Sequence, residues 1–146
     1  MTKVLIIGAS GSIGSVVAPE LLKKTKADLV LASRHPQEIT IDDLGREEAT
    51  QLDVTNDQEL AVALKGVDFV FAALSGRMNV FAKHLVKVMN TVGVKRLAFI
   101  TTMGIYQEIP AWLGESPDPY HNMILRPYRK AADIIENSDL DYTIIR

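Results

Sequence analysis

Short apolar runs alternate along the chain with segments whose apolar residues recur every three or four positions. The continuous apolar run at residues 4–7 is typical of a strand buried on both faces of a parallel sheet. From Ser12 to Leu21 the apolar residues instead lie at helical spacing on one face. The change of period predicts a strand, a glycine turn and a helix in that order.

The same alternation continues to the end of the sequence. It predicts further strands at residues 29–32, 49–54, 67–74, 97–100 and 142–145. It predicts further helices after the capping residues 55–57, over residues 81–92 and over residues 128–137. The proline-rich residues 104–126, which include the only tryptophan, are expected to form a long loop.

Strands that alternate with helices imply right-handed crossovers and a parallel sheet covered on both faces. We therefore predict a doubly wound α/β fold. A chain of 146 residues fits one domain, so residues 1–146 are expected to form a single unit. Because the sequence stops at Arg146, directly after a predicted buried strand, we expect a C-terminal substrate-binding segment to be lacking.

Charge and composition exclude several classes of partner. The formal net charge is −2 and both signs are interspersed, so no nucleic-acid or anionic-membrane partner is expected. The longest N-terminal apolar run is far shorter than the roughly 20 residues of a membrane span. The sequence has no cysteine, which excludes disulfides and thiolate metal sites and fits a reducing compartment. We expect a cytoplasmic protein.

The glycines after the first predicted strand are spaced G-x-x-G-x-x-G, at Gly8, Gly11 and Gly14. A glycine turn lets backbone amides approach a pyrophosphate that a β-carbon would obstruct, and the following helix directs free N–H groups and its positive dipole end at the phosphates. The spacing differs from the G-x-G-x-x-G fingerprint, but the strand before it and the helix after it favour a Rossmann-type dinucleotide site.

The end of the second predicted strand indicates which dinucleotide binds. An acidic residue there would accept hydrogen bonds from the ribose of NAD, whereas this chain has Ser33 and Arg34, followed by His35. The Arg34 guanidinium can bind a 2′-phosphate, which favours NADP(H) over NAD(H). Asp53, at the end of the third predicted strand, is either a ligand contact or a turn-forming aspartate.

Five motifs together resemble the short-chain dehydrogenase/reductase superfamily, in particular its atypical branch with NmrA-like and NAD(P)H-binding members. They are the glycine motif 8–14, Leu-Asp-Val at 52–54, Ala-Ala-Leu-Ser-Gly at 72–76, Thr-Thr-Met-Gly-Ile-Tyr at 101–106 and Asp-Tyr-Thr-Ile-Ile-Arg at 141–146. The resemblance covers essentially the whole chain.

The resemblance implies a set of cofactor contacts. The pyrophosphate would be lined by Gly8, Ser10, Gly11, Ser12, Ile13 and Gly14, the adenosine phosphate by Arg34, the adenine by Asp53 and Val54, and the ribose by Ala73 and Leu74. Thr102 falls where the family places a catalytic serine or threonine, whose hydroxyl hydrogen-bonds a carbonyl being reduced. It is also compatible with an ordinary threonine at a strand end.

The family's catalytic tyrosine, four residues before a lysine, has no counterpart in this chain. Lys130 is present, but Arg126 occupies the tyrosine position and Tyr128 lies only two residues away, on nearly the opposite side of a helix. Tyr106 is a candidate acid from the loop, although a packing role is the alternative. No histidines and carboxylates have metal-ligand spacing, so no metal is expected.

Three functions remain open from the sequence. The first is an atypical reductase that transfers hydride to a small carbonyl or quinone-like substrate, with Thr102, Lys130 and Tyr106 as candidate catalytic residues. The second is a non-catalytic NADP(H)-binding sensor that acts through a protein partner. The third is a sugar-nucleotide epimerase-like enzyme, which would need the absent tyrosine. The fold alone does not choose among them.

Overall fold

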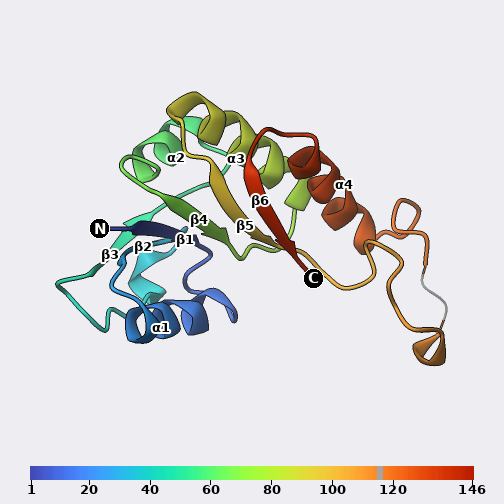
Figure 1. The fold of residues 1–146 in the computed structure, drawn as a ribbon, viewed down its shortest axis with the longest axis horizontal. Helices are drawn as coiled ribbons and strands as arrows, with labels where there is room; N and C mark the ends of the chain where they lie inside the picture. Colours follow the sequence, from blue (N-terminus) through green and yellow to red (C-terminus); the bar gives the residue numbers. More distant parts are fainter. Residues whose placement is uncertain (115–116) are drawn as a thin grey trace.

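One six-stranded parallel sheet forms the centre of the molecule (Figure 1). The computed structural model describes residues 1–114 and 117–146. The strands are β1 (Lys3–Ile7), β2 (Asp28–Ser33), β3 (Glu47–Gln51), β4 (Phe69–Ala72), β5 (Arg96–Ile100) and β6 (Asp141–Ile145). Their spatial order is β3-β2-β1-β4-β5-β6, the order of a doubly wound dinucleotide-binding sheet. The predicted fold class is confirmed.

Four helices cover the two faces of this sheet. They are α1 (Gly14–Lys24), α2 (Asp57–Ala63), α3 (Met78–Val92) and α4 (Leu125–Glu136), with short 3-10 helices at Pro36–Glu38 and Ala111–Leu113. Alternate residues of β1 enter different cores: Leu5 and Ile7 pack on the side of α2, α3 and α4, whereas Val4 and Ile6 pack on the side of α1. The apolar run at residues 4–7 is thus buried on both faces, as its composition predicts.

The helix ends follow from local chemistry. Asn56 caps α2, because its side-chain oxygen accepts hydrogen bonds from the backbone N–H groups of Gln58 and Glu59. The helix α3 ends at Gly93, whose φ of 82° is the left-handed conformation that glycine adopts without strain. Both residues lie where the sequence predicts a helix boundary.

Several predicted boundaries are wrong. The helix α1 begins at Gly14 rather than at Ser12, and β4 is confined to Phe69–Ala72. The strand β3 begins and ends earlier than predicted, at Glu47–Gln51, because this edge strand carries polar residues while the apolar Leu52 and Val54 that follow are buried beyond its end.

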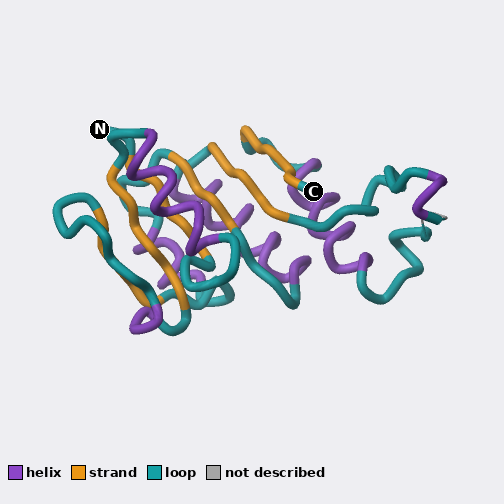
Figure 2. The backbone as a smooth tube through the Cα atoms, turned by 90° about the horizontal axis from the view of Figure 1, so that it is seen from below, coloured by secondary structure: helices purple, strands orange, loops and turns teal. Residues whose placement is uncertain are grey.

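The helix α4 begins three residues earlier than expected, at Leu125, with Pro127 in its first turn, where proline is tolerated. The expected loop at residues 104–126 is irregular over most of its described residues, but Ala111–Leu113 forms a 3-10 helix and the last two residues belong to α4. Residues 115–116 of that prediction lie outside the described residues. Figure 2 shows this segment leaving β5 and extending beyond the sheet before the chain returns to α4. Among the described helices, none is long and apolar enough to span a membrane.

Candidate functional site

The glycine turn joins the carboxyl end of β1 to α1. Gly8 has a φ of 83°, and the N–H groups of Gly8 and Ala9 both donate to the Ala32 carbonyl of the neighbouring β2, at 3.0 and 3.1 Å. The Gly11 N–H donates back to the Gly8 carbonyl at 3.0 Å, which closes the turn. The turn is therefore a rigid extension of the sheet rather than a loose connection.

The three glycines are required for different reasons. A β-carbon on Gly8 would lie 2.0 Å from the Ala73 carbonyl oxygen, and one on Gly14 would lie 2.2 Å from the Gly8 carbonyl oxygen. Both glycines are therefore demanded by the close approach of protein backbone to backbone. A β-carbon on Gly11 would come no nearer than 3.3 Å to any protein atom, again the Gly8 carbonyl oxygen. Gly11 is the glycine whose missing side chain leaves room for a ligand.

The start of α1 has unsatisfied donors beside this space. Within residues 1–114 and 117–146, the N–H groups of Ser12 and Ile13 have no hydrogen-bond acceptor. No acidic side chain occupies the first turn of α1, and Ile13 provides no capping oxygen. Free N–H groups and the positive end of a helix dipole favour a bound anion such as a phosphate.

A cavity of about 520 Å³ opens along the carboxyl ends of β1, β2 and β4 and the segment after β3. This is the edge at which parallel α/β sheets bind ligands. The cavity is lined by Ile7, Gly8, Ser10, Gly11, Ser33, Arg34, His35, Glu38, Leu52, Asp53, Val54, Ala73, Leu74, Ser75, Gly76, Arg77 and Phe81. Of the cofactor contacts predicted from the sequence, Ser12, Ile13 and Gly14 are on the adjoining turn and the others line this cavity.

Ser33 connects the glycine turn to the end of β2. Its hydroxyl oxygen is 2.8 Å from the Ser10 hydroxyl, to which it is hydrogen-bonded, and it accepts a hydrogen bond from the His35 N–H at 3.1 Å. Ser33 is buried, with 8% of its surface exposed. The Ser33 hydroxyl therefore orients the turn and the residues after β2 relative to each other, so that Arg34 projects from a fixed backbone.

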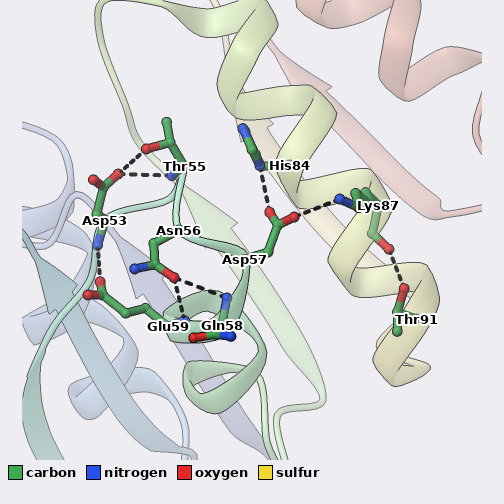
Figure 3. Close-up of polar contacts among 9 residues, drawn as sticks. All are labelled: Asp53, Thr55, Asn56, Asp57, Gln58, Glu59, His84, Lys87 and Thr91. Carbon is green, nitrogen blue, oxygen red and sulfur yellow. Dashed lines mark hydrogen bonds and ion pairs between the residues drawn. The ribbon is translucent and has the colours of Figure 1, made fainter.

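Asp53 is both a turn residue and a cavity residue. One carboxylate oxygen accepts hydrogen bonds from the Thr55 N–H at 2.9 Å and from the Thr55 hydroxyl at 2.7 Å, and the Asp53 N–H donates to the Glu59 carboxylate (Figure 3). Hydrogen bonds from Thr55, and then the positive charges of Arg34 and Arg77, lower the pKa of Asp53 below its ordinary value. The carboxylate is therefore ionised at neutral pH, and Asp53, Arg34 and Arg77 all line the same cavity.

Arg77 is a cavity residue that the sequence patterns did not predict. It lies between β4 and α3 with φ −77° and ψ 66°, and the Met78 N–H donates to the Gly76 carbonyl at 2.8 Å. These values describe an inverse γ-turn, which directs the Arg77 side chain to the cavity wall. The signal available in the sequence is a basic residue directly after Gly76 at the end of a buried strand. Glu38 and Phe81 also line the cavity and were not predicted.

Thr101 and Thr102 have different surroundings at the end of β5. The Thr101 hydroxyl donates to the Ile145 carbonyl of the edge strand β6 at 2.8 Å, so its proton is already used within the sheet. Thr102 is half-buried, and its hydroxyl has no hydrogen-bond partner among the described residues. Of the two, Thr102 keeps a hydroxyl available to a ligand.

The structure does not bring any of the three predicted catalytic residues, Thr102, Tyr106 and Lys130, to the cavity wall. The Tyr106 hydroxyl donates to the Glu136 carboxylate of α4. Burial, followed by the hydrogen bond to Glu136, raises the pKa of Tyr106 to about 12. Lys130 lies on the exposed side of α4, without an ion pair to any described residue. The described residues contain no group of three or more side chains arranged to hold a metal ion.

Comparisons with known proteins agree with this geometry. Residues 8–146 match a family described as NAD(P)H-binding. A Rossmann-fold NAD(P)-binding family protein from Shigella flexneri is 32% identical over 99% of this chain and 66% of its own, with a TM-score of 0.81. A search of curated proteins gave no match.

Two further solved structures share the fold at lower identity. A short-chain dehydrogenase/reductase from Veillonella parvula, in complex with NADP, is 22% identical over 99% of this chain and 68% of its own, with a TM-score of 0.83. The enzyme WbmH from Bordetella bronchiseptica, in complex with NAD⁺, is 18% identical over 99% of this chain and 55% of its own, with a TM-score of 0.79. This chain thus spans about two thirds or less of the length of these structures.

Proposed function

The chain belongs to the NAD(P)H-binding family, and from this premise we propose that it is an NADP(H)-dependent oxidoreductase of the atypical short-chain dehydrogenase/reductase type. The proposed reaction transfers a hydride between the nicotinamide and a small carbonyl or quinone-like substrate. The observation that carries the proposal is that Gly11 and Arg34 line the same cavity.

The residues of the cavity fit an NADP(H) molecule in three parts. The N–H groups of Ser12 and Ile13 would hold the pyrophosphate, because they lack acceptors in the protein and lie at the start of a helix. Arg34 would hold the 2′-phosphate through charge-assisted hydrogen bonds. Val54 and Leu74 would provide apolar contacts for the adenosine.

Catalysis by this chain would consist mainly of orientation. The bound cofactor supplies the hydride chemistry. The Thr102 hydroxyl would donate a hydrogen bond to the carbonyl oxygen of the substrate and polarise it, since Thr102 follows β5 and its hydroxyl is uncommitted. Tyr106 has no part in this proposal, because its proton is held by Glu136.

Glu38 provides the argument for the alternative nucleotide. It lines the same cavity as Arg34, and a carboxylate near the adenosine ribose accepts hydrogen bonds from the hydroxyls of NAD(H). Among the solved structures of this fold, the Veillonella protein is in complex with NADP and WbmH is in complex with NAD⁺. The nucleotide preference must therefore be measured on this protein.

Calorimetric titration with NADPH, NADP⁺, NADH and NAD⁺ tests the proposal. We expect the two phosphorylated forms to bind more tightly, and Arg34→Ala to weaken them by about tenfold to a hundredfold while it leaves the other two unchanged. Arg126→Ala is the matched control, because Arg126 is exposed on α4, outside the cavity wall. Equal affinity for all four dinucleotides would overturn the NADP(H) assignment.

The absent tyrosine–lysine pair favours a second candidate function, a non-catalytic NADP(H) sensor that changes its association with a protein partner. Turnover of NADPH with a panel of aldehydes and quinones separates the two. A reductase loses turnover in Thr102→Ala and still binds NADPH. A sensor binds NADPH, does not oxidise it in the presence of any acceptor of the panel, and distinguishes NADPH from NADP⁺ in its association with a partner.

A further inference from the structure

Arg129 of α4 is a partly buried cation at the centre of a polar cluster outside the dinucleotide cavity. Only 14% of its side chain is exposed. One terminal nitrogen donates to Asp133 at 2.7 Å and to Glu136 at 3.4 Å, both on the same helix. Burial alone would lower the pKa of Arg129, but the hydrogen bonds to Tyr120 and Asp133 outweigh it and raise the pKa, so the guanidinium stays charged.

The beginning of the long segment after β5 is held on this cation through Tyr106. The Arg129 guanidinium carbon lies 4.7 Å from the centre of the Tyr106 ring, and the Tyr106 hydroxyl donates to Glu136. A second guanidinium, that of Arg146 at the end of β6, lies 5.0 Å from the same ring. These cation–π contacts are strong where the groups are shielded from water.

The turn between Thr102 and Tyr106 is closed by Glu108. Its carboxylate accepts hydrogen bonds from the N–H groups of Gly104 and Tyr106, at 2.8 and 2.9 Å, and lies 3.2 Å from the Arg146 side-chain nitrogen. Because these hydrogen bonds hold the backbone between Thr102 and Tyr106, a displacement of Tyr106 would also displace Thr102.

The other end of the same segment is held on the same guanidinium. Arg129 Nε donates to the Tyr120 hydroxyl at 3.0 Å, and its guanidinium lies 5.6 Å from the centre of the Tyr120 ring. The Tyr120 hydroxyl in turn donates to Asp133 at 3.2 Å. One planar cation therefore contacts two rings that are 14 residues apart in the chain (106 and 120).

We propose that Arg129 is a positioning residue, which holds Tyr106 and Tyr120 on α4 and thereby fixes the Thr102 hydroxyl at the carboxyl end of β5. The proposal rests on the proposed function, in which that hydroxyl orients the substrate carbonyl. Lysine cannot replace Arg129, because an ammonium group lacks the planar face and the fork of donors that serve two rings and two carboxylates at once.

The protein carries its own reporter of this segment. Trp112, the only tryptophan of the sequence, lies between Tyr106 and Tyr120 and is 82% exposed. Time-resolved fluorescence anisotropy of Trp112 measures the local motion of the segment without any substrate. In Arg129→Met, which keeps the apolar stem and removes the guanidinium, we expect faster local depolarisation of Trp112 and an unchanged Kd for NADPH.

The kinetic test uses the same variants. With NADPH and a quinone acceptor, we expect kcat/KM of Arg129→Met to fall by about tenfold to a hundredfold, since a small displacement of a positioning group has such an effect. Arg129→Lys should not rescue it. Arg126→Met, one turn earlier on α4, is the matched control and should change neither the anisotropy nor the rate. Should Arg129→Met fail to fold, the double variant with Tyr106→Phe and Tyr120→Phe removes the hydroxyl bonds and keeps the rings.

The outcomes separate this inference from the proposed function. Unchanged Trp112 depolarisation in both Arg129→Met and the double variant would overturn the inference. Increased motion with an unchanged kcat/KM would also overturn it, because Arg129 would then hold the segment without positioning Thr102. If the wild-type protein binds NADPH and reduces no acceptor, the reductase function fails, and the fluorescence result still reports whether Arg129 holds the segment.

Discussion

Of the glycines in the turn, Gly11 is the one whose substitution should affect dinucleotide binding more than stability. Gly14 is buried, and an added β-carbon would overlap the Gly8 carbonyl, so Gly14→Ala should destabilise the fold by about 1–3 kcal/mol or more. In Gly11→Ala the new methyl group meets the protein only at 3.3 Å and otherwise enters the cavity. We expect Gly11→Ala to change stability by less than about 1 kcal/mol and to weaken dinucleotide binding at least about tenfold.

Chemical denaturation and calorimetry of the two variants measure these effects side by side. Gly66→Ala is a useful comparison, because Gly66, unlike Gly11 and Gly14, has a positive φ, of 74°, which strains any side chain, while it has open space around it and lies outside the cavity. It should lose stability and keep its dinucleotide affinity. Full affinity in Gly11→Ala would show that no ligand approaches the turn at this glycine.

Arg77 and Arg34 should act on different parts of a dinucleotide. Arg34 follows β2, whereas Arg77 follows β4, and β1 with its glycine turn lies between these strands. We therefore expect Arg77 to contact the pyrophosphate, which all four dinucleotides share. We expect Arg77→Ala to weaken all four by a similar factor of about ten, measured by calorimetry, with the exposed Lys83→Ala as control. A loss confined to NADPH and NADP⁺ would instead assign Arg77 to the 2′-phosphate.

At the residue scale, the sequence predicted the cavity best where the chain leaves a strand. Arg34, Asp53 and Ala73 all follow or approach the carboxyl ends of parallel strands, so their meeting at one edge is a consequence of the fold. Arg77 was not predicted, because its side chain is directed to the cavity by a γ-turn, which leaves no periodic pattern in the sequence. The partial burial of Arg129 could not be predicted from the sequence either. A single arginine on a helix is usually solvated, and its two tyrosine partners lie in an irregular segment.

At the scale of elements, α2 is joined to α3 by one carboxylate. Asp57, the first residue of α2, accepts hydrogen bonds from His84 Nδ1 at 2.6 Å and from Lys87 Nζ at 2.7 Å, both on α3 (Figure 3). The hydrogen bond from Lys87, and then that from His84, lower the pKa of Asp57 below its ordinary value of 3.8. The contribution of this carboxylate to stability is therefore fully present above about pH 4 and is lost as the pH falls through the lowered pKa.

Asp57→Asn should accordingly lower the free energy of unfolding at pH 7, and the difference from the wild type should shrink below pH 4. Urea denaturation at a series of pH values measures this difference. Asp139→Asn is the control, because Asp139 is exposed after α4 and has no ion pair among the described residues. A difference that persists undiminished at pH 3 would mean that the ionised Asp57 carboxylate does not join the helices.

The element boundaries show where local pattern and tertiary structure disagree. The buried Leu52 and Val54 resemble strand residues in the sequence, yet they follow β3, because the chain has already turned toward the Asx turn at Asp53. Glu47 begins β3 although it is charged, since its carboxylate accepts hydrogen bonds from the N–H groups of Asp42 and Asp43. The spacing of apolar residues predicts which residues are buried. In the central strands the buried residues are also the paired ones, whereas at the edge strand β3 they are not.

At the scale of the whole molecule, the sheet order was predictable because few topologies satisfy strands that alternate with helices and right-handed crossovers. The same reasoning predicts where a ligand binds but not which substrate is reduced. In the proposed function the substrate lies beside the irregular segment after β5, in which exposed apolar residues such as Trp112 and Met123 follow no period in the sequence.

A cofactor that bridges the carboxyl ends of several strands should stabilise the molecule as a unit. The proposed function places NADPH against elements on both sides of β1, in a site that only the folded chain forms. NADPH at 100 times its Kd should therefore add about 2.7 kcal/mol to the free energy of unfolding. For a domain of this length the expected increase in Tm is about 8 °C, measured by differential scanning calorimetry. At the same NADPH concentration Arg34→Ala should keep the Tm of the free protein and show a smaller increase, whereas Arg129→Met should show the full increase. A full increase in the Tm of Arg34→Ala would mean that the 2′-phosphate contributes nothing to binding. The loss of the increase in Arg129→Met would mean that the segment after β5 belongs to the cofactor site rather than to the substrate side.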